Sequence, residues 1–285
     1  MEFEAGSCIA KIGYDEKEIA MGRGERERNA LALANQILGV EKSPKLIRYY
    51  KNYEGFPGYI TFLELLPGEV LPAEIFNEIA ATDKNIAIAV SALKILHSHK
   101  SERFDELTPN SPNDIYKYFT TRFDRIKATV EEAGLDEELS KSLNLLPKVF
   151  DYFREYSNSS FIHGDLNFKN VLVKNNELTS LIDWDRSLIA PIGLEFAQVG
   201  VLTEKYGVSN WHKKLTENYI EAYDGDGELL QKEILLLQYF VYFLLLSRKL
   251  THIYQKGKVE ICAETGEELK DHFIRKIKEY KIPTL

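Results

Sequence analysis

Cysteine is scarce in this sequence. The 285 residues include only Cys8 and Cys262, which lie near opposite ends of the chain and have no metal-ligand spacing. A cysteine-ligated metal site is therefore not expected. Two free thiols in a reduced cytoplasm fit this pattern better than a bridge, which the sequence alone leaves open. The expected location is cytoplasmic.

Long hydrophobic runs and an apolar leader are also lacking. The first residues carry acidic side chains and contain no apolar core, so no signal peptide is expected. The most apolar run covers residues 234–246, includes Gln238 and is too short to span a bilayer. We interpret it as a buried helix and expect no membrane partner.

Positive charge is in deficit, with 36 Lys and Arg against 44 Asp and Glu and a net charge of -8. Nucleic acids are bound through basic patches, so a nucleic-acid partner is not expected. A cationic substrate would suit an acidic protein, but solubility explains a charge of this size equally well. The chain is 44% hydrophobic and 28% charged, which indicates a globular protein of one large domain or two packed lobes.

The most informative segment reads FIHGDLNFKNVLVKNNELTSLIDWD. Within it, two short apolar stretches, residues 170–173 and 179–182, flank a polar turn and predict a β-hairpin. Such a hairpin brings the segment with Asp165 and Asn170 close to the strand end with Asp183. Two carboxylates and an amide gathered in this way suit phosphoryl transfer.

The residue types match what phosphoryl transfer requires, which is alignment and charge neutralisation rather than covalent help. Magnesium prefers hard oxygen ligands, which Asp183 and Asn170 would supply beside phosphate oxygens and water. A separate carboxylate must accept the proton of the attacking hydroxyl, and Asp165 is placed for that role. Gly164 permits a tight turn, and we expect His163 to brace the loop through hydrogen bonds.

The pattern His-Gly-Asp-x-x-x-x-Asn, followed by Ile-Asp-x-x, resembles the aminoglycoside phosphotransferase and choline kinase-like family, which has the protein-kinase fold. The resemblance implies that Asp165 is the catalytic base and that Asn170 and Asp183 hold Mg²⁺. It also implies ATP as phosphoryl donor, with GTP not excluded. The alternative is a hairpin with incidental polar residues, although the first pattern occurs by chance in on the order of one in a thousand chains of this length.

The resemblance implies an α+β, two-lobed, protein-kinase-like fold. Residues 1–66 would form a small antiparallel β lobe that binds nucleotide and ends in the hinge. Residues 67–285 would form a large, mostly helical lobe with the catalytic loop and the acceptor site.

A lysine and a glutamate in the small lobe are the next candidates. Residues 3–12 predict a strand with Lys11 near its end, and residues 25–38 predict a helix. Glu27 lies on the apolar face of that helix, whereas the competing Glu25 lies off it. By resemblance, Glu27 would pair with Lys11 and position it on the α- and β-phosphates. The alternative is that Lys11 and Glu27 are ordinary surface residues, which either residue type commonly is when taken alone.

The predicted strands at residues 45–50 and 58–65 end in Leu-Leu-Pro-Gly. This ending resembles the family's hinge, where backbone groups bind adenine. The resemblance places the carbonyl of Glu64 and the amide of Leu66 at the adenine edge. An ordinary turn after a strand is the alternative.

The remainder of the chain is predicted to be largely helical. The expected helices include residues 85–97, a stretch ending near 132 after a loop at 109–111, residues 139–156 with a break near Pro147, and residues 234–254. His97 and His99 diverge on a helix, so a packing or surface role is preferred to a metal pair. Several aromatic residues could line an acceptor site or pack the core, namely Trp184, Tyr239, Phe240 and Tyr242.

The amino terminus departs from the family pattern. Only ten residues precede Lys11, whereas the family has two strands and a phosphate-covering loop there. Two hypotheses follow. The first is an active kinase for a hydroxyl of an amino sugar, amino alcohol or sugar, which the Asp165, Asn170 and Asp183 set favours. The second is a non-catalytic or weakly active nucleotide- or ligand-binding regulatory protein on the same fold. The sequence motifs carry no prediction of the oligomeric state.

The segment after Asp183 departs as well. The family commonly continues with Gly-Asp-Pro and an acidic residue, whereas this chain has Ala-Pro-Ile at 190–192 and then Glu195. Loss of the aspartate is expected to alter how the large lobe is braced or how an acceptor sits. Asn167 replaces the phosphate-contacting lysine of protein kinases, which favours a small acceptor over a protein.

Overall fold

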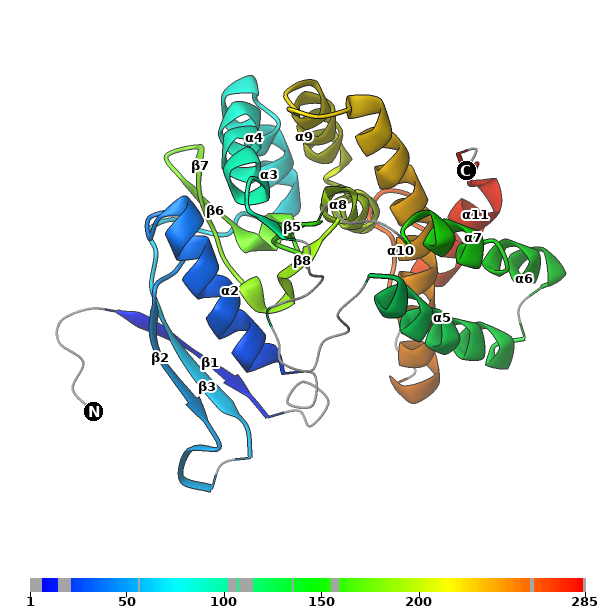
Figure 1. The fold of residues 1–285 in the computed structure, drawn as a ribbon, viewed down its shortest axis with the longest axis horizontal. Coiled ribbons are helices and arrows are strands. Elements are labelled where there is room, and N and C mark those ends of the chain that lie inside the picture. Colours follow the sequence, from blue (N-terminus) through cyan, green and yellow to red (C-terminus); the bar gives the residue numbers. More distant parts are fainter. Residues whose placement is uncertain are drawn as a thin grey trace.

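The protein has an α+β architecture, with a small antiparallel sheet followed by a larger helical portion (Figure 1). The computed structural model describes residues 7–14, 22–55, 57–101, 107, 115–134, 136–154, 159–256 and 259–283. The predicted strand start at 3–6, the loop at 109–111 and the helix end at 155–156 lie outside these residues.

The first sheet has the strand order β1-β3-β2, in which β1 is Cys8–Gly13, β2 is Leu46–Lys51 and β3 is Tyr59–Glu64. Both outer strands run antiparallel to β3. Helix α2 (Arg23–Leu38) lies between this sheet and the rest of the molecule (Figure 1). Its apolar face is buried in a core that also includes residues of the helical portion, so this helix connects the sheet to the rest of the protein.

The predicted hairpin is present as β6 (Val171–Lys174) and β7 (Glu177–Leu181). Strand β6 begins one residue later than predicted, because Phe168–Asn170 forms a 3-10 turn, η2. The turn residues Asn175 and Asn176 have φ angles of 53° and 62°, the left-handed conformation that asparagine tolerates in tight hairpins. The sequence signal and the local structure therefore agree here.

A second antiparallel sheet was not predicted. It has the order β4-β5-β8, with β4 at Lys100–Ser101, β5 at Ser159–Ile162 and β8 at Leu188–Ala190. These strands are two to four residues long, too short for a period of two to stand out in the sequence. Strand β5 leads into the predicted catalytic loop and pairs with β8. Their pairing holds the residues just before the catalytic loop beside residues 188–190, which follow Asp183 in the chain.

The helices outside the small sheet are α3 (Ala73–Ala80), α4 (Asp83–His97), α5 (Ile115–Glu132), α6 (Glu137–Leu143), α7 (Leu146–Tyr152), α8 (Ile192–Tyr206), α9 (Ser209–Glu221), α10 (Gly227–Lys256) and α11 (Leu269–Glu279). The break predicted near Pro147 separates α6 from α7 and falls at residues 144–145. Pro147 lies in the first turn of α7, where its missing N–H breaks no helical hydrogen bond.

Helix α10 forms the centre of the helical portion and packs against α5, α8 and α11. It is longer than the apolar run in the sequence indicated, and Gly227–Thr251 is long and apolar enough to cross a membrane by length and composition. In the structure, however, 61% of its most apolar window is buried inside the protein. Tyr239, Phe240 and Tyr242 are at most 2% exposed, which confirms core packing for these aromatic residues.

Candidate active site

The loop that carries Asp165 begins where β5 ends. Gly164 has a φ of 73°, and a Cβ atom there would lie 2.2 Å from the carbonyl oxygen of Arg186, so a side chain cannot fit. The backbone N–H of Asp165 donates to Nδ1 of His163 at 3.3 Å. Nε2 of His163 lies 3.0 Å from the carbonyl oxygen of Ile182 and donates to it in this tautomer. His163 thus braces the loop against the strand end before Asp183.

A buried carboxylate holds the same loop from the other side. Glu195 on α8 is fully buried and accepts hydrogen bonds from the backbone N–H groups of His163 at 2.6 Å and Gly164 at 3.2 Å. We expected the missing aspartate in this region to alter the bracing of the large lobe. The structure shows Glu195 bracing the catalytic loop. The sequence signal was an acidic residue within the otherwise apolar stretch 192–197 at the start of α8 (Ile192–Tyr206).

Asn170 connects the loop of Asp165 to Ile182, the residue before Asp183. Its Nδ2 donates to the carbonyl oxygen of Asp165 at 2.8 Å, and its own carbonyl oxygen accepts from the N–H of Ile182 at 3.0 Å. Asn167 also donates to the carbonyl oxygen of Asp165, at 3.0 Å. The loop and the residue before Asp183 are therefore connected by direct hydrogen bonds.

Asp183 and Asn170 present a donor set that fits Mg²⁺. The amide nitrogen of Asn170 is engaged with Asp165, which leaves Oδ1 as the available ligand atom, and the side chain of Asp183 is 39% exposed. In the described part of the chain, no group of three or more His, Cys, Asp or Glu residues could hold a metal. One carboxylate and one amide suffice where phosphate oxygens and water complete the octahedron around Mg²⁺.

Lys11 connects the small sheet to Asp183. Its Nζ lies 2.6 Å from Oε1 of Glu27 on α2 and 2.6 Å from Oδ1 of Asp183. Although burial disfavours its charged form, the two carboxylates raise the pKa of Lys11. Burial opposes ionisation of Asp183 too, but Lys11 lowers its pKa below the ordinary value. The structure thus brings together three predicted residues that are up to 172 positions apart in the chain.

The competing Glu25 makes a different contact, with Nζ of Lys51 at 2.9 Å on the exposed edge of the sheet. Asp185, which we did not single out from the sequence, lies in the short helix η3 (Trp184–Arg186) and is 8% exposed. Burial and the neighbouring Asp183 raise its pKa. Its Oδ2 is 3.7 Å from Nη1 of Arg23, a contact between η3 and the start of α2.

Glu64 and Leu66 lie where β3 ends and the chain leaves the sheet. Glu64 is the last residue of β3, and Leu66 is 7% exposed. Just beyond, the N–H of Glu69 donates to the carbonyl oxygen of Val173, and the N–H of Val173 donates to Glu69, both at 2.9 Å. The segment with the predicted hinge residues is therefore attached to the hairpin of the catalytic segment.

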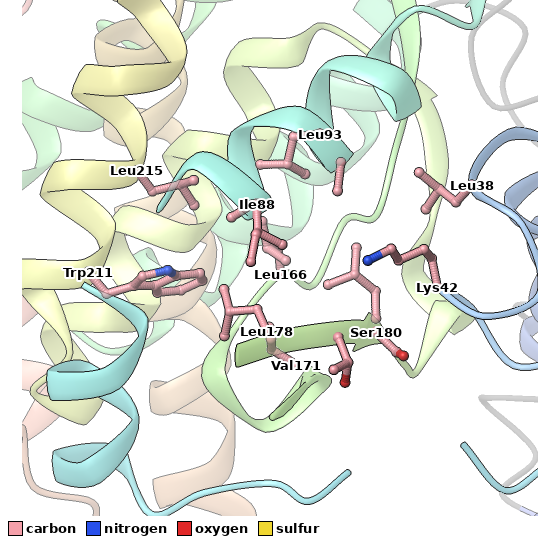
Figure 2. A pocket seen from close by; sticks show the side chains of 14 residues that line it. Leu38, Lys42, Ile88, Leu93, Leu166, Val171, Leu178, Ser180, Trp211 and Leu215 are labelled. Atoms are coloured by element: carbon pink, nitrogen blue, oxygen red, sulfur yellow. The ribbon is translucent and has the colours of Figure 1, made fainter. Parts of the chain in front are cut away.

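A separate apolar cavity of about 40 Å³ lies among α2, α4, β7 and α9 and is partly open to solvent (Figure 2). Leu166, next to Asp165, lines it together with apolar residues such as Leu93 and Leu178. Figure 2 shows Lys42 and Trp211 on opposite sides of it. Among the residues that the structure describes, its lining contains no carboxylate, so the polar cluster around Asp165 and Asp183 remains the candidate active site.

Comparison with known proteins identifies the family and the fold. Residues 15–232 match the model of the phosphotransferase enzyme family. No curated protein matches the chain in sequence. Solved structures share the fold at low identity. ADP-bound aminoglycoside phosphotransferase APH(2'')-Ib has a TM-score of 0.63 at 13% identity, covering 96% of this chain and 86% of that one.

Two further solved structures resemble this chain with similar TM-scores and identities. The gentamicin complex of APH(2'')-IIa has a TM-score of 0.65 at 13% identity, covering 96% of this chain and 86% of that one. A choline/ethanolamine kinase family protein from Mesorhizobium loti has a TM-score of 0.64 at 14% identity, covering 96% of this chain and 82% of that one. The structural likeness shows the kinase-like fold, and the family model covers most of the sequence. The chain belongs to the phosphotransferase enzyme family.

Proposed function

We propose that this protein is an ATP-dependent phosphotransferase that transfers a γ-phosphoryl group to a hydroxyl of a small molecule. The observation that carries the proposal is the convergence of Asp165, Asn170 and Asp183 with the Lys11–Glu27 ion pair of the small sheet. In this proposal residues 1–66 form the nucleotide-binding lobe, and residues 67–285 carry the catalytic loop and acceptor site. We further propose a cytoplasmic protein with neither nucleic acid nor membrane as partner.

Asp165 is the catalytic base in this reaction. Its carboxylate accepts the proton of the acceptor hydroxyl while the hydroxyl oxygen forms a bond to the γ-phosphorus. The bond from that phosphorus to the bridging oxygen breaks, and the nucleoside diphosphate leaves. His163 accepts a hydrogen bond from the backbone N–H of Asp165, and Glu195 accepts from the N–H groups of His163 and Gly164, which keeps the base in place.

The other residues bind the nucleotide. Lys11, oriented by Glu27, contacts the α- and β-phosphates, and the backbone groups of Glu64 and Leu66 bind the adenine edge. Asp183 and Asn170 hold Mg²⁺, which when bound neutralises the charge of the phosphates. Two solved structures of similar fold are GDP complexes of an aminoglycoside 2'-phosphotransferase, so GTP belongs in the test beside ATP.

The test combines binding with turnover. Thermal unfolding is measured with and without Mg-ATP or Mg-GTP, and phosphorylated products are then sought over a panel of hydroxyl acceptors. For Asp165→Asn we expect kcat to fall by about 10²- to 10⁴-fold, because the general base is lost, with nucleotide stabilisation retained. The control is Asp224→Asn, whose side chain is 88% exposed at the surface and pairs with Lys94.

Absence of nucleotide-dependent stabilisation at millimolar concentration would contradict the proposed donor. Stabilisation by nucleotide with no transfer to any acceptor would instead favour the non-catalytic regulatory protein.

A further inference from the structure

The apolar cavity of Figure 2 lies next to the catalytic segment. Leu166 and Val171, two of its lining residues, directly follow Asp165 and Asn170 in the chain. Asp165 itself, which the structure describes, does not line the cavity, so the cavity is separate from the site proposed for phosphoryl transfer. A molecule bound in it would contact the chain neighbours of the catalytic residues.

The space exists because small side chains face it. Ala89 and Ala92, three positions apart on α4, line the cavity where larger residues would fill it. The cavity volume is about 40 Å³. By this measure one water molecule needs about 10–15 Å³, so there is room for about three waters or for a short hydrocarbon chain. Because the cavity is partly open to solvent, such a chain can enter while a polar end group stays at the opening.

Two hydrogen-bond donors of the lining lack acceptors. Figure 2 shows the side chain of Lys42, a half-buried residue that follows α2, extending toward the cavity. Among the described residues, its ammonium group has no ion-pair or hydrogen-bond partner. Trp211, on the opposite side, is 1% exposed, and its Nε1 is buried without an acceptor in the described part of the chain. A buried donor without an acceptor is unfavourable, so this side of the cavity requires one.

The hydroxyl groups of the lining are already engaged. That of Thr179 donates to the carbonyl oxygen of Leu172 at 3.1 Å. That of Ser180 donates to the carbonyl oxygen of Glu41 at 2.9 Å. The cavity therefore combines an apolar interior with a cation on one side and a neutral donor on the other. The complementary molecule has a short apolar chain, an anionic group at one end and an acceptor at the other.

We propose that the cavity binds a short aliphatic oxo carboxylate. Its carboxylate pairs with the ammonium group of Lys42, and its oxo group accepts a hydrogen bond from Nε1 of Trp211. Its chain packs against Leu166 and Leu178 between them. An amine would meet like charge at Lys42, and an uncharged ketone would leave the ammonium group unpaired. This inference goes beyond the proposed phosphotransferase function and does not depend on it.

The test uses four compounds with a five-carbon chain: 4-oxopentanoate, pentanoate, 2-pentanone and pentylamine. Thermal unfolding is measured without nucleotide, at millimolar ligand and constant ionic strength. A ligand that binds only the folded protein raises its Tm. We expect 4-oxopentanoate to raise Tm most, pentanoate to raise it less because it leaves Trp211 without an acceptor, and the other two to leave it unchanged. Tryptophan fluorescence in the same titration should change with 4-oxopentanoate, because Trp211 lines the cavity.

Variants of the two donors locate the polar contacts. Lys42→Gln removes the cation, so we expect the dissociation constants of both carboxylates to rise by about tenfold or more. Lys45→Gln is the matched control, because Lys45 is exposed in the same segment and does not line the cavity. Trp211→Phe keeps an aromatic ring without the donor. It should lower the affinity for 4-oxopentanoate to that for pentanoate and abolish the fluorescence change.

A third variant fills the cavity. Ala92→Leu occupies the space of the chain, so neither carboxylate should then raise Tm. Ala87→Leu is its matched control, because Ala87 lies on the exposed face of the same helix and should leave the response intact. The Tm of each variant without ligand shows that it folds, and Lys42→Gln keeps the test decisive if Ala92→Leu does not.

The proposal is overturned if neither carboxylate raises Tm, if 2-pentanone or pentylamine raises it as much as pentanoate does, or if Lys42→Gln responds to carboxylates as the unaltered protein does. Release of the ligand by Mg-ATP would place it in the nucleotide site and overturn the proposal as well. Binding that persists in Asp165→Asn, with or without phosphoryl transfer by the unaltered protein, supports the cavity site and leaves the proposed function to its own test.

Discussion

Glu195 illustrates how one side chain determines the position of another that it does not touch. Its buried carboxylate accepts hydrogen bonds from the backbone N–H groups of His163 and Gly164, and these residues directly precede Asp165. An unpaired buried backbone N–H is costly, so the loop adopts the conformation in which both donors reach the carboxylate. Glu195 is accordingly a positioning residue for the base.

Replacement of Glu195 tests this role. Glu195→Ala leaves two buried donors without an acceptor, so we expect the free energy of unfolding to fall by about 3 kcal/mol or more. Glu195→Gln keeps one oxygen acceptor and should lose less. Urea denaturation measures the free energy of unfolding of both variants. In Glu195→Ala, kcat should also fall while nucleotide binding is retained. Glu221→Ala, an exposed position on α9, is the control. Unchanged stability of Glu195→Ala would contradict the bracing role.

Helix α2 is the element that links the nucleotide-binding sheet to the catalytic segment. Its buried face supplies Glu27 to Lys11, and its first turn places Arg23 near Asp185. The two contacts lie on the side of the helix that faces the hairpin and η3. Displacement of α2 would therefore move Lys11 and the Asp183 region relative to each other.

Two glutamates of α2 form a matched pair of variants. Glu27→Gln removes the charge that orients Lys11, and we expect kcat/KM to fall by about 10²-fold because the nucleotide is misplaced. Glu25→Gln loses only the exposed contact with Lys51 and should change activity little. Steady-state kinetics over a range of Mg-ATP concentrations separates the two. Equal losses in both variants would show that Lys11 does not depend on Glu27.

At the scale of the whole molecule, α8, α9 and α10 pack closely around a half-buried histidine, His212. A Cβ atom on Gly200 would lie 2.5 Å from Gln238 and 2.9 Å from His212. Nε2 of His212 lies 3.2 Å from the carbonyl oxygen of Phe196. Burial lowers the pKa of His212 from 6.5 to about 4, so the folded protein keeps this group neutral.

This burial predicts a loss of stability in mild acid. Between pH 6.5 and about 4 the unfolded chain binds a proton at His212 that the folded chain does not, so stability falls as pH falls through that window. The contribution reaches at most about 3 kcal/mol. Urea denaturation across the window should show a weaker pH dependence for His212→Gln than for His99→Gln. Identical pH profiles for the two variants would contradict the assignment.

Features encoded in neighbouring residues could be predicted from the sequence. The hairpin of β6 and β7, the apolar face of α2 and the break near Pro147 each depend on patterns within a few positions. The short strands β4, β5 and β8 were missed because they form through pairing with distant strands. Glu195 was seen as a departure from a family pattern, but its bond to the catalytic loop was not predicted.

The sequence by itself determined the kinase-like fold and the family, through the resemblance carried by the motif with Asp165, Asn170 and Asp183, because a short motif records a local arrangement of residues. Only the tertiary structure decided that Glu195 braces the loop and that Arg186 lies 3.5 Å from the carboxylate of Asp165. These contacts join separate helices and turns, and side chains from such elements meet only once the core has packed.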